Sequence, residues 1–490
     1  MMTVHLRDLA AHLGTELPPG ADAVLVSGVT HNSTWVRPGD VFVAIRGAVH
    51  DGHDHISDAL SRGAVAVIGE GHAAAHDLRV PYLRVTDARV ALADVAVMLN
   101  DHPSARLRMA GVTGTKGKTT TSWLIRHLLR TAGHRTGLLS TLGYKLEDDT
   151  LHQFPAHFTT PEAPQVQETL ARIVDQGCTH AVVEASSEAL AQRRLRGTQF
   201  DVAVWTNLAP EHLNFHGDME GYFQAKRILF ESSSFAVVNR RDPWGMRLVD
   251  RIHTTYADQG GLGADWWASD ILEDGEGLSF SVHHPQGQFA ATFPMIGTYN
   301  VANAMAAIAA VAHLGIALPD IQRGLASFPG VPGRMQVLQT APVRVILDFA
   351  HTPESLRMAL STLRQTTAHR LTVVLGSAGG PRDPSKRAPL GEVAATLADL
   401  AIFTEEDCRD TPIYDILNEM RRGADEVGRT NYVLQPDRLQ AIAYALSLAE
   451  PGDTVVFCGK AGEITLERAT ETLPWIEETI VRSAMADLGW

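Results

Sequence analysis

Residues 107–133 read LRMAGVTGTKGKTTTSWLIRHLLRTAG. A short apolar stretch leads into glycines at positions 111, 114 and 117, and an apolar stripe at helical spacing follows them up to Gly133. This order predicts a strand, a glycine loop and a helix. Such a unit holds phosphate groups because backbone N–H groups and the positive helix N-terminus can approach the oxygens. Lys118 would supply a charge there, and the hydroxyl of Thr119 would lie where Mg²⁺ is coordinated.

The glycine spacing departs from the strict Walker pattern. That pattern has a glycine at the position of Val112, whereas the glycine of this chain stands at position 111. A chance glycine turn is the alternative interpretation, but the flanking strand and helix patterns favour a nucleotide site. By itself the loop indicates only that a phosphate is held.

Length and composition limit the class of protein. A chain of 490 residues is too long for a single core, so about two to four domains are expected. The net charge of −14 argues against bulk binding of nucleic acid or of anionic membranes. Three widely separated cysteines predict a reduced, cytoplasmic protein without disulfides. The absence of an apolar run of about 18 residues predicts no membrane insertion.

Residues 1–105 read as a separate small α/β unit. Strands are predicted at 41–45 and 64–68, and a helix at 90–99. The segment DGHDH (51–55) has the composition of a metal cluster. A polar loop is the favoured interpretation, because neighbouring residues on a loop fix no coordination geometry.

The central part of the chain alternates strands and helices, as a largely parallel sheet requires. Predicted strands at 136–140, 179–183 and 200–206 end near polar residues. Because the carboxyl ends of parallel strands face one crevice, we expect Thr119, Glu184 and His212 to converge near the phosphates as metal ligands. The alternatives are a solvated strand end for Glu184 and a helix cap for His212.

The last part of the chain repeats the alternation. Strands are predicted at 343–347, 371–375, 400–403 and 454–457, and helices at 354–363, 387–397 and 439–449. The glycine-rich segment 376–380 follows a strand but lacks both GxGxxG and the acidic residue of a dinucleotide site, which argues against NAD.

Taken in order, these segments resemble the Mur ligase family, and most of all its E-type members, the UDP-N-acetylmuramoyl-dipeptide:amino-acid ligases. The resemblance covers nearly the whole chain. It rests on the motifs PGDVFVAIRG, GVTGTKGKTT, EASSEAL, TNLAPEHLNFHG, YFQAKRILF, GTYNVANAMAA, GVPGRMQ, LDFAHTPESL, GGPRDPSKR and CGKAGE.

The resemblance implies an α/β chain of three domains. These would be a small UDP-substrate-binding domain (1–105), a central P-loop NTPase-like parallel sheet that binds ATP (106–332) and a Rossmann-like amino-acid-binding domain (333–490). ATP, with Mg²⁺, would phosphorylate the carboxylate of UDP-MurNAc-L-Ala-D-Glu, and a free amino acid would attack the acyl phosphate. We further expect a cytoplasmic monomer that acts in peptidoglycan biosynthesis, and so in cell shape and cell division, without nucleic-acid or membrane partners.

The family motifs assign roles to individual residues. By position, the catalytic residues would be Lys118, Lys226 and His212, and the metal ligands Thr119, Glu184, His212 and Lys226 as a carbamate. The ATP contacts would be Gly114, Thr115, Lys116, Gly117, Lys118, Thr119, Thr120, Asn300, Arg334, Asp348 and His351. The muramyl-peptide contacts would be Ser33, Thr159, Thr160, Ser187, Gln192 and Arg194. The amino-acid contacts would be Arg382, Asp407, Arg409, Gly459 and Glu463. Without the family, Lys226 reads as a surface helix lysine.

Several family signatures are altered here. Lys116 replaces the asparagine of GTNGKTT, Glu211 and Asn214 replace the aspartates of DHLD, and Glu188 replaces the histidine of SSH. GKGHE appears as GKAGE (459–463). Each replacement is polar or small, so we expect an active but divergent ligase. Lys116 is open to two interpretations, a spare cation beside the phosphate or an exposed loop lysine.

The amino acid that is added is suggested by one motif. The family's DNPR appears within EEDCR (405–409), which retains Arg409 as a partner for an amino-acid carboxylate. Asp407 with Glu463 would suit a lone ammonium, which favours L-ornithine or L-lysine over meso-diaminopimelate. A solvated acidic loop is the plainer interpretation.

Other functions remain as alternatives. A folylpolyglutamate synthetase or the ligase part of a cyanophycin synthetase would share the phosphate loop, but the PGDVFVA segment before that loop argues against the folate enzyme. A nucleotide-binding paralogue that no longer ligates is the third possibility. The retained Lys118, Glu184, His212 and Lys226 argue against it.

Overall fold

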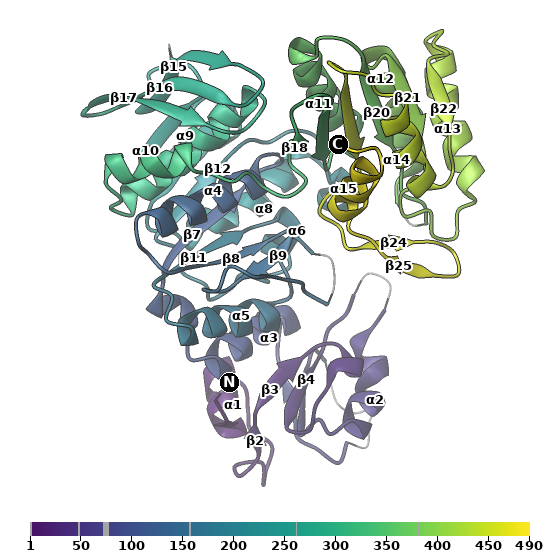
Figure 1. Ribbon diagram of the computed structural model, residues 1–490. Helices are drawn as coiled ribbons and strands as arrows, with labels where there is room; N and C mark the ends of the chain where they lie inside the picture. Colours follow the sequence, from purple (N-terminus) through teal and green to yellow (C-terminus); the bar gives the residue numbers. More distant parts are fainter. Residues whose placement is uncertain (1, 48–49, 72–77, 156–157, 261, 381) are drawn as a thin grey trace. The chain divides into compact units, whose positions relative to one another are not determined.

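The computed structural model describes residues 2–47, 50–71, 78–155, 158–260, 262–380 and 382–490, and it has an α/β fold (Figure 1). Contacts divide the chain into two compact units. Unit 1 comprises residues 1–267 and 302–324, and unit 2 comprises residues 268–301 and 325–490. The boundaries fall inside β15 (Trp266–Glu273), α9 (Tyr299–His313) and α10 (Leu318–Ala326).

The first part of unit 1 is a four-stranded parallel sheet with the order β3-β4-β5-β6. Its strands are β3 (Gly28–Thr30), β4 (Asp40–Ala44), β5 (Ala66–Gly69) and β6 (Tyr82–Arg84). Around it lie the antiparallel pair β1 (Val4–His5) and β2 (Leu25–Val26), and the helices α1 (Leu6–Leu13), α2 (Ile56–Ser61) and α3 (Ala88–Leu99). Both central strands are buried along their whole length, as parallel strands covered on both faces should be. The predicted strands and helix of this part are confirmed, with ends shifted by about two residues.

The larger sheet of unit 1 carries the phosphate loop. Its strands run in the order β10-β9-β8-β11-β7-β12-β13-β14, and the six from β8 to β14 are parallel. Their bounds are β7 (Arg108–Thr113), β8 (Thr136–Ser140), β9 (Gly143–Lys145), β10 (Leu151–His152), β11 (His180–Glu184), β12 (Val202–Trp205), β13 (Ala236–Asn239) and β14 (Thr254–Ala257). Glu184 pairs with Val112 across the sheet, so β7, β11 and β12 end at the same edge. The predicted parallel sheet is confirmed.

Helices connect these strands. They are α4 (Lys118–Thr131), α5 (Ala163–Asp175), α6 (Ser187–Ala191), α7 (Leu213–His216) and α8 (Met219–Glu231). In α4 the predicted apolar stripe of Leu124, Ile125, Leu128 and Leu129 is fully buried. Burial of this stripe holds the helix against β8 and β11, which fixes its N-terminus at the end of the glycine loop.

Unit 2 contains a second mostly parallel sheet, with the order β18-β19-β23-β20-β21-β22. Its strands are β18 (Gln336–Gln339), β19 (Arg344–Asp348), β20 (Leu371–Leu375), β21 (Leu400–Phe403), β22 (Tyr432–Leu434) and β23 (Thr454–Cys458); only β18 is antiparallel. The helices are α11 (Pro353–Thr366), α12 (Arg387–Leu397), α13 (Ile413–Glu426), α14 (Arg438–Ser447) and α15 (Glu477–Asp487). A hairpin joins β24 (Thr465–Glu467) to β25 (Thr472–Pro474). All four predicted strands and all three predicted helices are confirmed.

Two further features complete the described fold. The antiparallel strands β16 (Leu278–His284) and β17 (Gly287–Phe293) interrupt the alternation predicted for the central part. The sequence pattern could have predicted β16, because Leu278, Phe280 and Val282 alternate with more exposed residues. In the described residues, no helix is both long enough and apolar enough to cross a membrane.

One buried histidine, His180, makes the stability of this fold depend on pH. His180 begins β11, its Nδ1 lies 2.8 Å from Thr179 Oγ1, and its ring centroid lies 4.6 Å from that of His134. Burial lowers the pKa of His180 to about 4, below its ordinary value of 6.5. The folded chain therefore resists a proton that the unfolded chain accepts.

We predict that His180 makes unfolding easier as the pH falls from 6.5 towards 4, by up to about 1.4 kcal/mol for each pH unit. The lowered pKa gives stability that is present above pH 6.5 and is lost in this window. The unfolding temperature of H180Q, measured by calorimetry at pH 7 and pH 5, should therefore fall less than that of the unchanged protein. The exposed His55 provides the control H55Q. Equal falls for H180Q and the unchanged protein would contradict the prediction.

Candidate active site

The phosphate loop is the short segment between β7 and α4. Gly114 has φ +150° and Gly117 has φ +83°. A Cβ atom at Gly114 would lie 1.8 Å from Thr206 Oγ1, and one at Gly117 would lie 2.3 Å from Asn303 Oδ1. Both positions therefore require glycine, for their backbone angles and for the space.

Two lysines converge on one carbonyl of this loop. Lys118 Nζ donates to the carbonyl oxygens of Gly114 (3.1 Å) and Thr115 (3.0 Å). Lys226, on α8, donates from Nζ to the same Gly114 oxygen at 2.7 Å, and its Nζ lies 4.5 Å from the ring centroid of Tyr222. Lys226 is only 1% exposed, so the interpretation of it as a surface lysine was wrong.

Burial lowers the pKa of Lys226 far below its usual value, and the charge of Lys118 adds to the effect. The lowered pKa increases the fraction of Lys226 that carries a neutral amine. Only the neutral amine can attack carbon dioxide, so the environment fits the carbamate that the family motif implies.

Glu184 ends β11 and is fully buried, which rules out a solvated strand end. Its Oε1 accepts from Thr119 Oγ1 at 2.8 Å and from Thr141 Oγ1 at 3.2 Å. Its Oε2 accepts from the Thr141 N–H at 2.7 Å. The hydroxyl of Thr119 and the carboxylate of Glu184 thus form a pair of hard oxygen donors, the type that Mg²⁺ prefers.

His212 follows β12 and adopts a left-handed backbone with φ +58°. Its side chain makes no capping hydrogen bond to α7, and its Nδ1 lies 3.9 Å from Glu188 Oε1. The His212 side chain is 49% exposed, and its partial burial lowers the pKa, which favours the neutral imidazole that metals bind. Within the described ranges, no three His, Cys, Asp or Glu side chains form a metal-binding group, so a metal site here would need Thr119 and a modified Lys226 as well.

Lys116 has a partner that the sequence did not suggest. Its Nζ lies 3.3 Å from Glu211 Oε1. Both side chains are about one-quarter exposed, at 29% and 25%. Neither earlier interpretation of Lys116, as a spare cation or as an exposed loop lysine, describes this ion pair.

Four of the predicted muramyl-peptide contacts are linked to Glu184 by hydrogen bonds, directly or through neighbouring residues. Thr160 Oγ1 donates to the carbonyl oxygen of Glu184 at 2.6 Å, and Thr141 Oγ1 donates to Thr159 Oγ1 at 3.1 Å. Arg194 donates to the carbonyl oxygen of Thr160 and to Gln192 Oε1, each at 3.0 Å.

The other two predicted contacts lie in different surroundings. Ser187 Oγ lies 2.9 Å from His216 Nε2. Ser33 lies after β3, where its hydrogen bond to the Asp58 carboxylate lowers the pKa of that group.

The remaining predicted ATP contacts belong to unit 2. Asp348 ends β19, accepts from the Met335 N–H at 2.8 Å, and has its pKa raised by burial. The guanidinium of Arg334 lies 4.4 Å from the ring centroid of Phe349. Asn300 Nδ2 donates to the carbonyl oxygen of Ile296 at 2.7 Å. His351 follows Asp348 by three residues, and its Nδ1 lies 2.9 Å from the Phe349 carbonyl oxygen.

The predicted amino-acid contacts gather at the carboxyl edge of the second sheet. Asp407 and Glu463 both bind Lys460, which is fully buried and lies 2.7 Å from Asp407 Oδ1. Arg409 is held by Glu467, with Nε and Oε2 2.7 Å apart. Residues 405–407 are all buried, so the solvated acidic loop is wrong. Arg382, in contrast, is exposed.

Glu406 is a residue of this cluster that the sequence did not single out. It is buried, and its Oε2 has no hydrogen-bond partner among the described residues. Burial raises the pKa of Glu406 in spite of the nearby Lys386 charge. A Cβ atom at Gly459 would lie 2.5 Å from Oε2, so this glycine leaves room for the carboxyl group. In the sequence, only the position of Glu406 within the acidic run 405–409 could have indicated a role for it.

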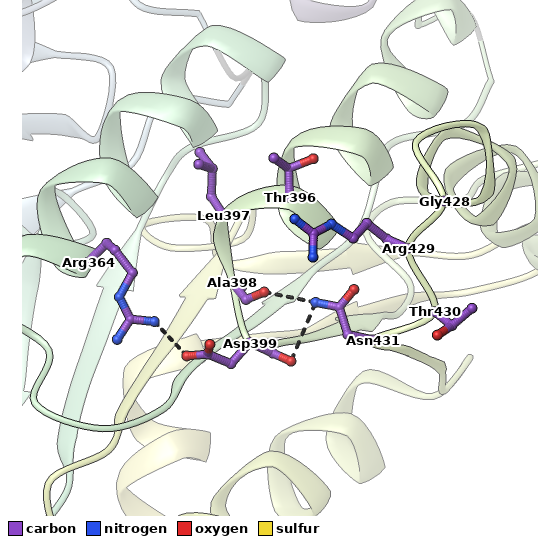
Figure 2. Close-up of a pocket in the computed structure, with 9 residues that line it drawn as sticks. All are labelled: Arg364, Thr396, Leu397, Ala398, Asp399, Gly428, Arg429, Thr430 and Asn431. Carbon is purple, nitrogen blue, oxygen red and sulfur yellow. Dashed lines mark hydrogen bonds and ion pairs between the residues drawn. The ribbon is translucent and has the colours of Figure 1, made fainter.

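A separate open pocket of about 520 Å³ lies at the other edge of this sheet (Figure 2). It lies beside the starts of β21 and β22, where Arg364 pairs with Asp399 at 2.5 Å and Asn431 donates to the Ala398 carbonyl oxygen at 2.8 Å. None of its lining residues was predicted to be functional.

Family profiles match three stretches of the chain. They are described as Mur ligase family, catalytic domain (residues 25–104), Mur ligase middle domain (112–311) and Mur ligase, glutamate ligase domain (333–461). A UDP-N-acetylmuramyl-tripeptide synthetase of Deinococcus radiodurans is 58% identical, over 99% of this chain and 100% of that protein. A UDP-N-acetylmuramoyl-L-alanyl-D-glutamate–2,6-diaminopimelate ligase of Gloeobacter violaceus is 39% identical, over 94% of each.

Two solved structures share the fold of this chain. A UDP-N-acetylmuramoyl-L-alanyl-D-glutamate–2,6-diaminopimelate ligase shares the fold with a TM-score of 0.68 and 29% identity, over 100% of both chains. A MurF ligase of Thermotoga maritima in complex with ADP has a TM-score of 0.63 and 21% identity, over 94% of this chain and 97% of that one.

The matches and the fold show that the chain is an ATP-dependent ligase that forms amide bonds. Within that class, the chain belongs to the Mur ligase family. The resemblance inferred from the sequence motifs is thereby confirmed.

The loop geometry predicts the effect of one methyl group. We expect G117A to weaken ADP binding by about tenfold or more, which corresponds to about 1.4 kcal/mol, because its Cβ would meet Asn303 Oδ1 and displace the loop. Gly133, with φ +88° and nothing within 4 Å of a Cβ, provides the matched control G133A. Calorimetric titration with ADP measures both variants. Equal affinities for G117A and G133A would contradict the steric argument.

Proposed function

We propose that the chain adds the third amino acid to UDP-MurNAc-L-Ala-D-Glu in peptidoglycan biosynthesis. The carboxylate of the dipeptide attacks the γ-phosphate of ATP, which gives an acyl phosphate and ADP. The amine of the amino acid then attacks the acyl carbon, phosphate leaves, and an amide bond forms. The convergence of Lys118, Lys226 and the Thr119–Glu184 pair on one phosphate loop is the observation that carries this proposal.

The chemistry explains the need for such a site. A carboxylate becomes an acylating agent only after phosphate is attached as a leaving group. Transfer between two anions requires concentrated positive charge. Lys118 and the N-terminus of α4 supply part of it, and Mg²⁺ would neutralise charge on the phosphates if held by Thr119, Glu184, His212 and carbamylated Lys226.

The three-domain division is part of the proposal. We assign UDP-substrate binding to residues 1–105, ATP binding to 106–332 and amino-acid binding to 333–490. Each of the three matched family ranges lies within one of these domains, which supports the division. The three cysteines are unpaired, which supports a reduced compartment, and we propose a monomer in the cytoplasm.

For the amino acid, we propose a dibasic acceptor, L-ornithine or L-lysine. Asp407 and Glu463 already flank one ammonium, that of Lys460, and Glu406 adds a buried carboxyl oxygen that has no hydrogen-bond partner in the described part of the chain. These groups favour a second lone ammonium and disfavour a carboxylate. A diaminopimelate acceptor is the alternative, favoured by the names of two relatives.

Phosphate release tests the function and the acceptor together. We expect release with ATP, UDP-MurNAc-L-Ala-D-Glu and ornithine or lysine, and much less with meso-diaminopimelate. D407N should lower kcat/KM for the dibasic acceptor, relative to meso-diaminopimelate, by about tenfold. The exposed Asp410 provides the control D410N. No release with any acceptor would disprove the ligase, and a preference for meso-diaminopimelate would disprove the acceptor proposal alone.

The buried amine of Lys226 generates a second prediction. We expect K226A and K226R to lose about 100-fold or more in phosphate release, because neither side chain can form a carbamate. Acetate should partly restore K226A, since its carboxylate can replace the missing one. Removal of dissolved carbon dioxide should lower the activity of the unchanged protein reversibly. An active K226R would show that the side chain acts as a plain cation.

A further inference from the structure

Two loops of unit 1 are joined at the carboxyl edge of the large sheet. The phosphate loop follows β7, and residues 207–212 follow β12. Lys116 lies in the first loop, where its N–H donates to Asn207 Oδ1 at 2.9 Å and its carbonyl oxygen accepts from Thr206 Oγ1 at 2.7 Å. Its side chain reaches Glu211 in the second loop.

A neighbouring contact joins the same two loops. Thr115 Oγ1 accepts from the Ala209 N–H at 3.0 Å and lies 3.2 Å from the hydroxyl of Tyr222. The ion pair of Lys116 and Glu211 is therefore one of several contacts that hold residues 207–211 against the phosphate loop. Because both charged groups are about three-quarters buried, their attraction is screened less than that of a surface pair.

The residue after Glu211 is His212, and its left-handed backbone is unfavourable for a side chain with a Cβ. On one side the His212 carbonyl oxygen accepts from the Phe215 and His216 N–H groups, at 3.0 and 3.1 Å. Glu211 directly precedes His212, so the ion pair ties the chain to the phosphate loop one residue before the imidazole. Lys116 and Glu211 each replace the usual residue of a family motif, and here the two replacements meet.

We propose that Lys116 and Glu211 are positioning residues whose ion pair fixes His212 beside the phosphate loop. The inference rests on the proposed nucleotide and Mg²⁺ site. It differs from the simpler idea that Lys116 binds phosphate, because Glu211 balances the charge of Lys116.

A set of variants separates these ideas. The variants are K116M, E211Q, the double variant, the charge swap K116E/E211K and the conservative K116R. Calorimetric titration with ADP, with and without Mg²⁺, measures binding without turnover. We expect K116M and E211Q each to weaken binding about tenfold with Mg²⁺ and little without it. The double variant should be no weaker than either single variant, and the swap and K116R should bind nearly as well as the unchanged protein.

The control breaks a more exposed ion pair at the opposite ends of the same two strands. Arg108 begins β7, and its Nε lies 2.8 Å from Oδ1 of Asp201, which precedes β12. R108M should lower the unfolding temperature without changing the effect of Mg²⁺ on ADP affinity. If the charge-neutral variants do not fold, K116R and the swap still test the pair, since both keep opposite charges in place.

Each other outcome overturns the proposal. Weaker binding in K116M with unchanged or tighter binding in E211Q would show that Lys116 binds phosphate directly. Equal losses with and without Mg²⁺, or additive losses in the double variant, would show that the pair does not position His212. Normal ADP binding in every variant would overturn the proposed role of the ion pair and leave the proposed function unaffected. No ADP binding by the unchanged protein would overturn the proposed function and the pair with it.

Discussion

The burial of Lys226 against the Gly114 carbonyl is the constraint on which the site depends. Lys118 donates to the same oxygen, so two ammonium groups would share one acceptor, and that of Lys226 is buried. A buried unpaired charge costs several kcal/mol, by rough estimates, and a second like charge nearby adds to that. A neutral Lys226, or one converted to an anion, would reduce this cost. Lys118 would then remain as the cation of the loop.

Parallel strands explain why the site can be assembled at all. In unit 1, β7, β11 and β12 end in the phosphate loop, in Glu184 and in the segment before His212. In unit 2, the segments after β21 and β23 bring Asp407 and Glu463 around Lys460. Each sheet thus gathers residues distant in sequence at one edge, because all its parallel strands end there.

Much of this fold could be predicted from local patterns. The apolar stripe of α4, the buried strands and the polar residue at the end of β11 all have signals within about ten residues. The burial of Lys226 had no such signal, because one lysine among the apolar residues of α8 is compatible with either face. The pair of Lys116 and Glu211 is separated by 95 residues, so only the fold brings it together. Glu406 could not be distinguished from its acidic neighbours, since an unpartnered oxygen is a property of the packing.

The charges of unit 2 change the reasoning about the acceptor. From the sequence, Asp407 added an uncompensated negative charge, and that charge favoured an ammonium. In the structure, Lys460 lies between Asp407 and Glu463, so much of the added charge is already balanced. Selection for a lone ammonium would then draw on Glu406 as well as on Asp407 and Glu463, since burial already raises the pKa of Glu406. An ammonium near Glu406 would lower this pKa and gain a charge-assisted hydrogen bond, whereas a carboxylate would raise it further. The buried carboxyl group would thus distinguish acceptors by the charge that each brings to it.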